Sequence, residues 1–265
     1  MTLRRSKLVD DAFGPSIESP GDPWVEKAWN SKAPATRRKH ARKALAVDPD
    51  CIDAYVLLAH EAESDAEQVA LLREAVRVGD RLYAPLLDDP DMHWWGFIGT
   101  RPYMRAMQNL GLAHEAIGDR ADAEAIYRRL LDMNPGDNQG IRMLLLRVLL
   151  DDGRVKDCAP IIALYEDDWS LEIMFTRLMI ELDKNTKRAP KRILAEIAER
   201  NEHAVDLLLR TLKTGKAPAD PSSSFVSLGS EDEALSYVAN FIECWQIKPK
   251  LVERLKTLMA GTRAS

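Results

Sequence analysis

The clearest pattern of apolar and polar positions in the chain lies in residues 103–135. Met107, Leu110, Gly111 and His114 are three or four residues apart, so they fall on one stripe of a helix. Glycine is costly inside a helix, but it is tolerated where a partner helix must approach closely. The stripe therefore predicts a helix that packs tightly against a second helix.

The second helix is predicted by the residues that follow. Gly118 suits the left-handed position that ends a helix, and Asp119 suits the cap of the next one. In the second helix Ala123 faces the close contact and Tyr127 stacks behind it, and Pro135 stops the helix. One hairpin of this size cannot bury its apolar face, so neighbouring hairpins are expected on both sides.

These positions, with their spacing, fit the 34-residue tetratricopeptide (TPR) pattern. The stretch is identified as a TPR repeat on this basis. The resemblance implies an all-α fold, a right-handed superhelical array of TPR-like antiparallel helical hairpins (an α-α solenoid). A composition with few aromatic residues agrees with a largely helical protein.

Breaks in the helical pattern predict how the chain is divided. The first residues are rich in glycine and proline, and TGKAPADPSSS is a polar loop without apolar period. Ser230 and Glu233 then form a capping box for a new helix. We expect a flexible N-terminal arm at 1–22, a TPR-like repeat array at 23–212, a loop at 213–229, and C-terminal capping helices packed on the array at 230–265.

An insertion rich in aromatic residues and proline precedes the best repeat. Trp94, Trp95 and Phe97 within it cannot all face solvent. They either pack against the helical array, or Trp94 and Trp95 form a second binding surface. The two interpretations are about equally supported by the sequence.

The charge pattern bears on the class of partner. A formal net charge of −5 argues against nonspecific nucleic-acid binding as the main activity. The segment Arg37–Lys43 is nevertheless strongly basic, which leaves an RNA-associated accessory protein as the alternative function. The solvated face of an end helix is the simpler interpretation of this segment.

We expect a cytoplasmic protein without a membrane partner. No window approaches the roughly 20 apolar residues of a spanning helix. The first residues lack the apolar core of a secretory signal. Cys51, Cys158 and Cys244 are far apart in sequence, as buried thiols of a reducing compartment would be.

Motifs of catalysis and of cofactor binding are absent from the sequence. His60 with Glu63, and His114 with Glu115, offer two metal ligands each, and no further His or Cys completes either site. The sequence therefore predicts a protein that is not an enzyme, with no cofactor and no metal site.

A second resemblance covers residues 49–255. Arg101-Pro102-Tyr103, Asp137-Asn138-Gln139-Gly140 and Gly229-Ser230-Glu231 are its most specific pieces. These phrases resemble a branch of bacterial tetratricopeptide proteins, and the later ones also resemble the suppressor of tumorigenicity 7 family. The resemblance implies a helical scaffold and no catalytic residues.

The TPR register also predicts which side chains line a concave groove. Residues offset around the first helices from the packing stripe face the concavity, with Val56 and Glu63 beside them. The predicted groove residues are His60, Arg105, Gln108, Asn109, Leu112, Met143 and Arg147. This mixture of hydrogen-bonding groups, cations and apolar groups suits a peptide with an acidic and a hydrophobic feature. We therefore expect a non-catalytic protein–protein interaction scaffold whose partner is another protein or peptide.

Overall fold

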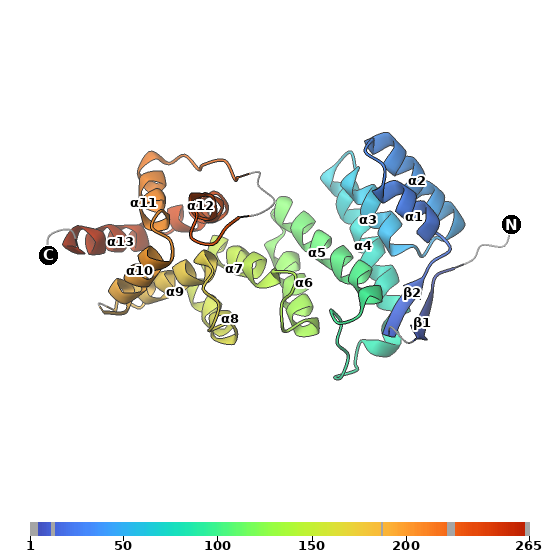
Figure 1. Cartoon of the computed structure of the whole chain (residues 1–265), viewed down its shortest axis with the longest axis horizontal. Coiled ribbons are helices and arrows are strands. Elements are labelled where there is room, and N and C mark those ends of the chain that lie inside the picture. Colours follow the sequence, from blue (N-terminus) through green and yellow to red (C-terminus); the bar gives the residue numbers. More distant parts are fainter. Residues whose placement is uncertain (1–4, 12–13, 187, 222–225, 263–265) are drawn as a thin grey trace. The chain divides into compact units, whose positions relative to one another are not determined.

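The computed structural model describes residues 5–11, 14–186, 188–221 and 226–262 (Figure 1). These residues form thirteen α-helices, three short 3-10 helices and two strands, so the protein is mostly helical, as predicted. The chain divides into two compact units, Met1–Arg142 and Met143–Ser265. The division thus falls in the first turn of helix α7 (Ile141–Asp151).

The first unit begins with a β-hairpin where the sequence predicted a flexible arm. Strand β1 (Lys7–Asp11) pairs antiparallel with β2 (Gly14–Glu18). An isolated two-stranded hairpin is marginally stable in water, so other segments must hold it. The hydroxyls of Ser6 and Ser19 both donate hydrogen bonds to the buried carboxylate of Asp48. These contacts span 42 and 29 residues of chain, which no local pattern reveals.

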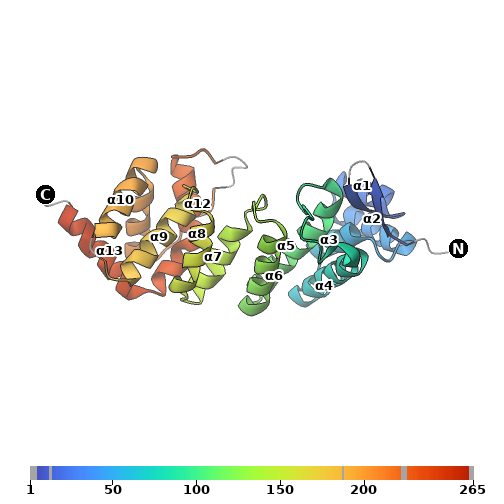
Figure 2. The same ribbon diagram turned by 90° about the horizontal axis from the view of Figure 1, so that it is seen from below.

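Six helices follow in the first unit, and each packs against the next (Figures 1 and 2). They are α1 (Asp22–Trp29), α2 (Pro34–Val47), α3 (Ile52–His60), α4 (Asp65–Leu82), α5 (Arg101–Ala116) and α6 (Arg120–Met133). Helix α3 also contacts α5, so these two first helices of successive hairpins lie side by side.

The α5–α6 hairpin packs closely at Gly111, as predicted, but the nearest side chain at this contact is Tyr127 and not Ala123. A Cβ placed on Gly111 would lie only 2.4 Å from the Tyr127 ring, so this glycine is needed for the approach of α6. Gly118 has a φ of +80°. The amide of Asp119 donates to the carbonyl of His114 at 2.8 Å, which completes the glycine-ended turn.

The aromatic insertion packs against the helices. It contains the 3-10 helices η1 (Ala84–Leu86) and η2 (Ile98–Thr100). The Trp94 ring lies 5.4 Å from Tyr83 and 5.9 Å from Tyr103, measured between ring centroids, and all three residues are buried. The insertion also supports the hairpin, because the Phe97 ring covers Gly14.

The second unit contains the remainder of α7 and six further helices. They are α8 (Ala159–Leu164), α9 (Leu171–Asp183), α10 (Arg188–Arg200), α11 (Ala204–Thr214), α12 (Glu231–Gln246) and α13 (Pro249–Thr262). The predicted hairpin after Pro135 has a broken second helix, made of the 3-10 helix η3 (Val155–Cys158) and the short α8. Pro160 lies in the first turn of α8, where it can start a helix but cannot continue one.

An aromatic stack forms the centre of the second unit. Phe175 on α9 lies 4.4 Å from Tyr237 on α12, and Tyr237 lies 5.3 Å from Phe241, between ring centroids. The indole of Trp245 is fully buried and donates a hydrogen bond to the Tyr237 hydroxyl at 2.9 Å. Helices α9 and α12 are therefore joined by apolar area and by one satisfied polar contact.

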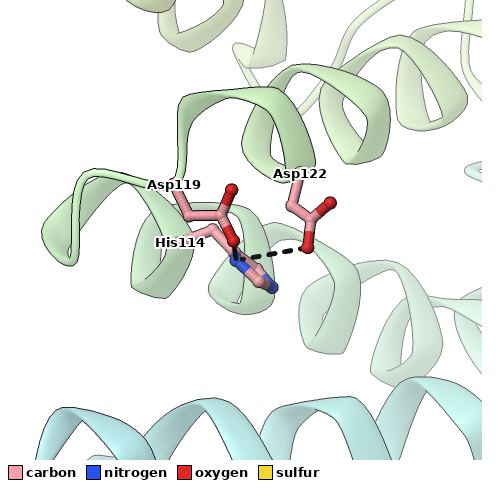
Figure 3. A group of neighbouring side chains, drawn as sticks. All are labelled: His114, Asp119 and Asp122. Carbon is pink, nitrogen blue, oxygen red and sulfur yellow. Dashed lines mark hydrogen bonds and ion pairs between the residues drawn. The ribbon is translucent and has the colours of Figure 1, made fainter.

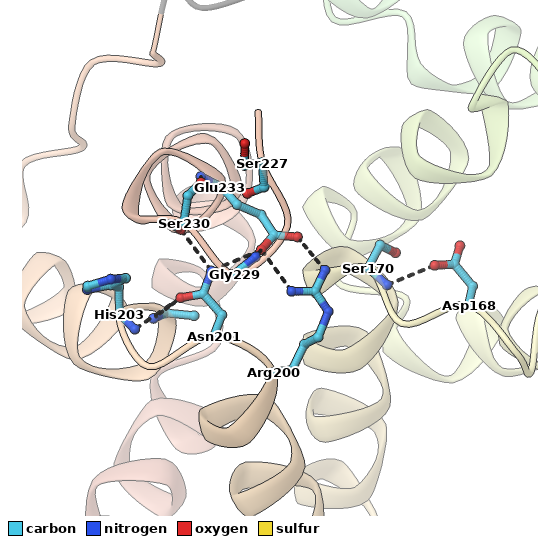
Figure 4. A network of polar contacts seen from close by, with 10 residues as sticks. Asp168, Ser170, Arg200, Asn201, His203, Ser227, Gly229, Ser230 and Glu233 are labelled. Atoms are coloured by element: carbon cyan, nitrogen blue, oxygen red, sulfur yellow. Dashed lines mark hydrogen bonds and ion pairs between the residues drawn. The ribbon is translucent and has the colours of Figure 1, made fainter. Parts of the chain in front are cut away.

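A polar network attaches α12 to the end of α10 (Figure 4). Ser230 accepts a hydrogen bond from the Glu233 amide, which confirms the predicted N-cap. The Glu233 carboxylate accepts two bonds from the Arg200 guanidinium and one from the amide of Gly229. Asn201 completes the network by donating to the Ser230 carbonyl. Helix α12 is thus fixed both by its cap and by a bidentate ion pair.

Candidate peptide-binding face

The predicted groove residues of the first unit lie on one surface, formed by α3, α5 and the end of α1. We call it the α3–α5 face. It comprises Trp29, Asp53, His60, Arg105, Gln108, Asn109, Leu112 and Gln139. Trp29, Asp53 and Gln139 are the members that the sequence pattern did not predict as site residues.

Trp29 is the largest apolar group on the α3–α5 face. It is the last residue of α1 and is 46% exposed, which is unusual for tryptophan. The His60 ring meets it edge-on at 6.3 Å between centroids, and the Arg105 guanidinium carbon lies 5.8 Å from its ring centroid. The face therefore presents an aromatic surface next to a cation, a combination common at the centres of protein interfaces.

Arg105 forms an ion pair with Asp53 on α3. Its Nη2 donates to Asp53 Oδ1 at 3.1 Å, and its side chain stays 43% exposed. Burial raises the pKa of Asp53 above its ordinary value, although the Arg105 charge acts in the opposite direction. The desolvation of this carboxylate thus outweighs the attraction of its partner. The Nε of Arg105 is buried and has no hydrogen-bond partner among the described residues.

Two amides stand beside the ion pair. Gln139 donates from Nε2 to Gln108 Oε1 at 2.9 Å, whereas its own Oε1 is buried and finds no donor within the described residues. Asn109 donates to the carbonyl of Arg105 at 3.0 Å, which occupies one of its amide hydrogens. Leu112, one turn further along α5, is 37% exposed.

The other residues predicted for the groove do not belong to the α3–α5 face. Val56 is completely buried, because it lies on the side of α3 that packs in the core, and so it offers no surface. Met143 and Arg147 are half-buried residues of α7 in the second unit. The α3–α5 face therefore consists of first-unit residues.

Of the two residues of the predicted second surface, Trp94 is buried and Trp95 stays partly exposed. Trp94 is 4% exposed and its backbone carbonyl accepts a hydrogen bond from the Thr100 hydroxyl. Trp95 is half-buried and lies under the Arg101 guanidinium, 4.6 Å from the ring centroid. Trp94 therefore packs against the helices, which is the first of the two alternatives for the insertion.

The basic helix α2 is partly neutralised by acidic residues that follow α3. Arg37 pairs with Glu61, and its Nε lies 2.6 Å from Glu61 Oε1. Arg38 pairs with Glu63 at 2.9 Å. The surface here has mixed charge, and Glu63 is directed to an arginine instead of joining His60 in a pair of metal ligands.

The second unit contains a pocket of about 550 Å³ between α8, α9 and α10. Its apolar lining consists of Ala159, Ile162, Ala163, Trp169, Ile180, Ala189 and Ile193. Trp169 is 53% exposed. The charged rim is paired within the unit, since Arg192 contacts Glu196 at 2.8 Å and Lys184 contacts Glu181 at 2.8 Å. The sequence reasoning missed this pocket, and a tryptophan beside the acidic run Glu166–Asp168 was the available signal.

Among the described residues, no helix combines the length and the apolar composition that a bilayer crossing requires.

Comparison with known proteins identifies relatives. A family model described as ST7 protein matches residues 17–88. The suppressor of tumorigenicity 7 protein-like of Rattus norvegicus is 30% identical over 156 residues, which cover 56% of this chain and 28% of the relative. The corresponding protein of Homo sapiens is 29% identical over 156 residues, covering 56% and 27%.

A longer match is found in Drosophila melanogaster. Its protein ST7 homolog is 25% identical over 266 residues, which cover 90% of this chain and 48% of the relative. These matches relate the chain to the suppressor of tumorigenicity 7 family, as the sequence resemblance predicted. The matched segment of the family model begins at residue 17, well before the predicted start of the likeness at residue 49. The chain spans less than half the length of these relatives.

Proposed function

We propose that this chain is a TPR-like interaction scaffold, without catalytic activity, that binds a peptide segment of another protein on the α3–α5 face. The peptide class that this face suits carries an apolar side chain next to an acidic one. The apolar side chain packs on Trp29, and the carboxylate binds Arg105. Helical repeats commonly bind extended or helical segments through apolar contacts and charged contacts of these two kinds.

The incomplete hydrogen bonding of Arg105 carries the proposal. A guanidinium has five N–H donors, yet Nη2 makes the contacts with Asp53 and the buried Nε has no partner among the described residues. A buried donor without an acceptor costs on the order of 1–3 kcal/mol. A carboxylate that approached this partly exposed side chain would offer two acceptors in the geometry that arginine prefers.

The Gln108–Gln139 pair supports a peptide as the ligand. The buried Oε1 of Gln139 is an acceptor that lacks a donor, at least among the described residues, while Arg105 supplies donors on the same face. A peptide backbone has both an N–H and a C=O group at each residue. It can therefore form hydrogen bonds both with the acceptor of Gln139 and with the donors of Arg105, which a simple anion cannot do.

The alternative function, an RNA-associated accessory protein, has less support. It would use the basic helix α2, but Arg37 and Arg38 are paired with Glu61 and Glu63. RNA binding of this kind needs a continuous positive surface. The mixed charge therefore favours a protein partner.

A peptide library displayed on phage tests the proposal. The full chain is immobilised, and bound peptides are sequenced after several rounds of selection. We expect enrichment of peptides with an acidic residue adjacent to a large apolar residue. A selection that enriches no common sequence, or enriches basic peptides, contradicts the assignment. Binding of single-stranded RNA that weakens steeply with salt would instead favour the alternative.

A further inference from the structure

A separate polar cluster lies at the turn between α5 and α6, and it consists of His114, Asp119 and Asp122 (Figure 3). The Nδ1 atom of His114 is 3.1 Å from Asp119 Oδ2 and 3.7 Å from Asp122 Oδ2. The imidazole is almost completely buried, at 1% exposed, whereas both carboxylates reach solvent. A fixed nitrogen thus faces two accessible oxygens.

Hydrogen bonding within the cluster does not account for both carboxylates. The Nδ1 of an imidazole carries at most one hydrogen, so it can make one good bond, which the shorter distance assigns to Asp119. Asp122 is then a second negative charge beside the first, and like charges at this separation repel. Arg73 lies 3.5 Å from Asp122, but its side chain is 58% exposed and such pairs contribute little.

Asp119 is also placed differently from an ordinary helix cap. It occupies the N-cap position of α6, where aspartate commonly accepts a bond from a backbone amide of the first turn. Its side chain makes no such bond and is directed to His114 instead. The cluster therefore gathers three ligand atoms from two helix ends, and one of them is diverted from the usual local partner.

The geometry points to a binding site for one divalent transition-metal ion, held by His114 Nδ1 and by a carboxylate oxygen from each of Asp119 and Asp122. All three atoms lie within 4.8 Å of one another. Metal–ligand distances of about 2.0–2.2 Å place neighbouring ligand atoms about 3.0–3.4 Å apart. The 3.1 Å separation of His114 Nδ1 from Asp119 Oδ2 is already in that range, and a movement of the exposed Asp122 side chain, which would also release Arg73, would shorten its 3.7 Å separation from His114.

The ligand types select the metal. Imidazole nitrogen with carboxylate oxygen suits zinc and its neighbours, whereas magnesium and calcium prefer oxygen ligands throughout. Three protein ligands leave a position open to water.

An ion here would join the end of α5 to the first turn of α6, and it would neutralise the two carboxylates. The site is independent of the α3–α5 face and of its peptide.

Zinc binding by the full chain tests this site. After removal of metal with a chelator, Zn²⁺ is titrated in competition with a fluorescent zinc indicator, and the ring nitrogens of ¹⁵N-labelled histidine are followed by NMR. We expect one zinc ion per chain and a shift of the His114 signal. The double variant Asp119→Asn/Asp122→Asn should bind roughly tenfold or more weakly. The control Asp132→Asn, an exposed position on the same helix, should bind like the parent chain.

The variants separate a loss of zinc binding from a loss of folding. The two varied side chains are exposed, so their loss should leave the melting temperature of the metal-free protein nearly unchanged, and either single variant can replace the double one. Absence of zinc binding by the parent chain overturns the proposal. Equal zinc binding by the parent and the Asp119→Asn/Asp122→Asn variant overturns it as well, because the ion then binds elsewhere.

Discussion

Arg105 on α5 and Asp53 on α3 form an ion pair at 3.1 Å, and burial has a larger effect on the pKa of the Asp53 carboxylate than the arginine charge has. The pKa of Asp53 is raised, so its charged form is disfavoured by folding. A raised pKa of this kind contributes stability that is complete below the ordinary aspartate value of 3.8 and is lost as pH rises through the folded-state pKa.

This sign gives a pH prediction. The variant Asp53→Asn removes the charge, so its free energy of unfolding relative to the parent chain should increase as pH rises from near 3.8 to neutral. Urea denaturation of both proteins across this range measures the difference. A relative stability that instead decreases with pH would mean that the attraction of Arg105 outweighs desolvation.

Gly111 allows a second prediction, on packing. Its added Cβ would lie 2.4 Å from the Tyr127 ring, which is itself buried. Gly111→Ala should therefore destabilise the first unit by about 1–3 kcal/mol, and Gly111→Leu by more. Gly136→Ala is the matched control, because the nearest atom to a Cβ there is 3.5 Å away. Similar melting temperatures for Gly111→Ala and the control would contradict the observed α5–α6 contact.

Two serines at helix starts form a third test. Ser230 caps α12 through its hydroxyl, whereas Ser170 occupies the same position of α9 without a capping bond, and its buried Oγ lacks a partner among the described residues (Figure 4). Ser230→Ala should cost about 1 kcal/mol of stability. Ser170→Ala should be neutral or slightly stabilising, because an unsatisfied hydroxyl is removed. Equal effects in denaturant unfolding would show that capping does not distinguish the two sites.

The cysteines should be chemically inert in the folded protein. Burial raises the pKa of the Cys51 thiol to about 12 and raises the pKa of the Cys244 thiol well above its ordinary value. Cys158 is also completely buried. Since the thiolate is the reactive form, alkylation by iodoacetamide at neutral pH should be slow until the chain is denatured. Rapid modification of Cys51 or Cys244 in the native chain, detected by mass spectrometry, would contradict this environment.

Local features of the sequence predicted much of the helical framework. Gly118 and Ser230 mark helix ends through backbone conformation and a short-range hydrogen bond, and both were placed correctly. Gly111 indicated the close helix contact because the spacing of its stripe is local, although the nearest side chain there is Tyr127 and not the expected Ala123. The broken helix after α7 was missed, although Pro160 marks the place where it restarts.

Features that depend on distant residues were not predictable in this way. The paired strands β1 and β2 rest on Asp48 and Phe97, and neither residue is near them in sequence. Trp29 looks like any helical tryptophan until Arg105 and His60 are seen beside it. The candidate metal ligand Asp122 was not paired with His114, because the fold of the turn brings them together.

Fluorescence anisotropy with one labelled peptide from the phage selection measures peptide binding on the α3–α5 face. Trp29→Ala removes the aromatic surface, and Asp53→Asn/Arg105→Gln removes the ion pair without leaving a single buried charge. Arg128→Glu, on the exposed side of α6, is the control.

We expect Trp29→Ala and Asp53→Asn/Arg105→Gln each to raise the dissociation constant by roughly tenfold or more, while the control binds like the parent chain. Circular dichroism should show the same helix content in all four proteins. Equal affinity in all of them would contradict the assignment and would direct attention to the α8–α10 pocket of the second unit.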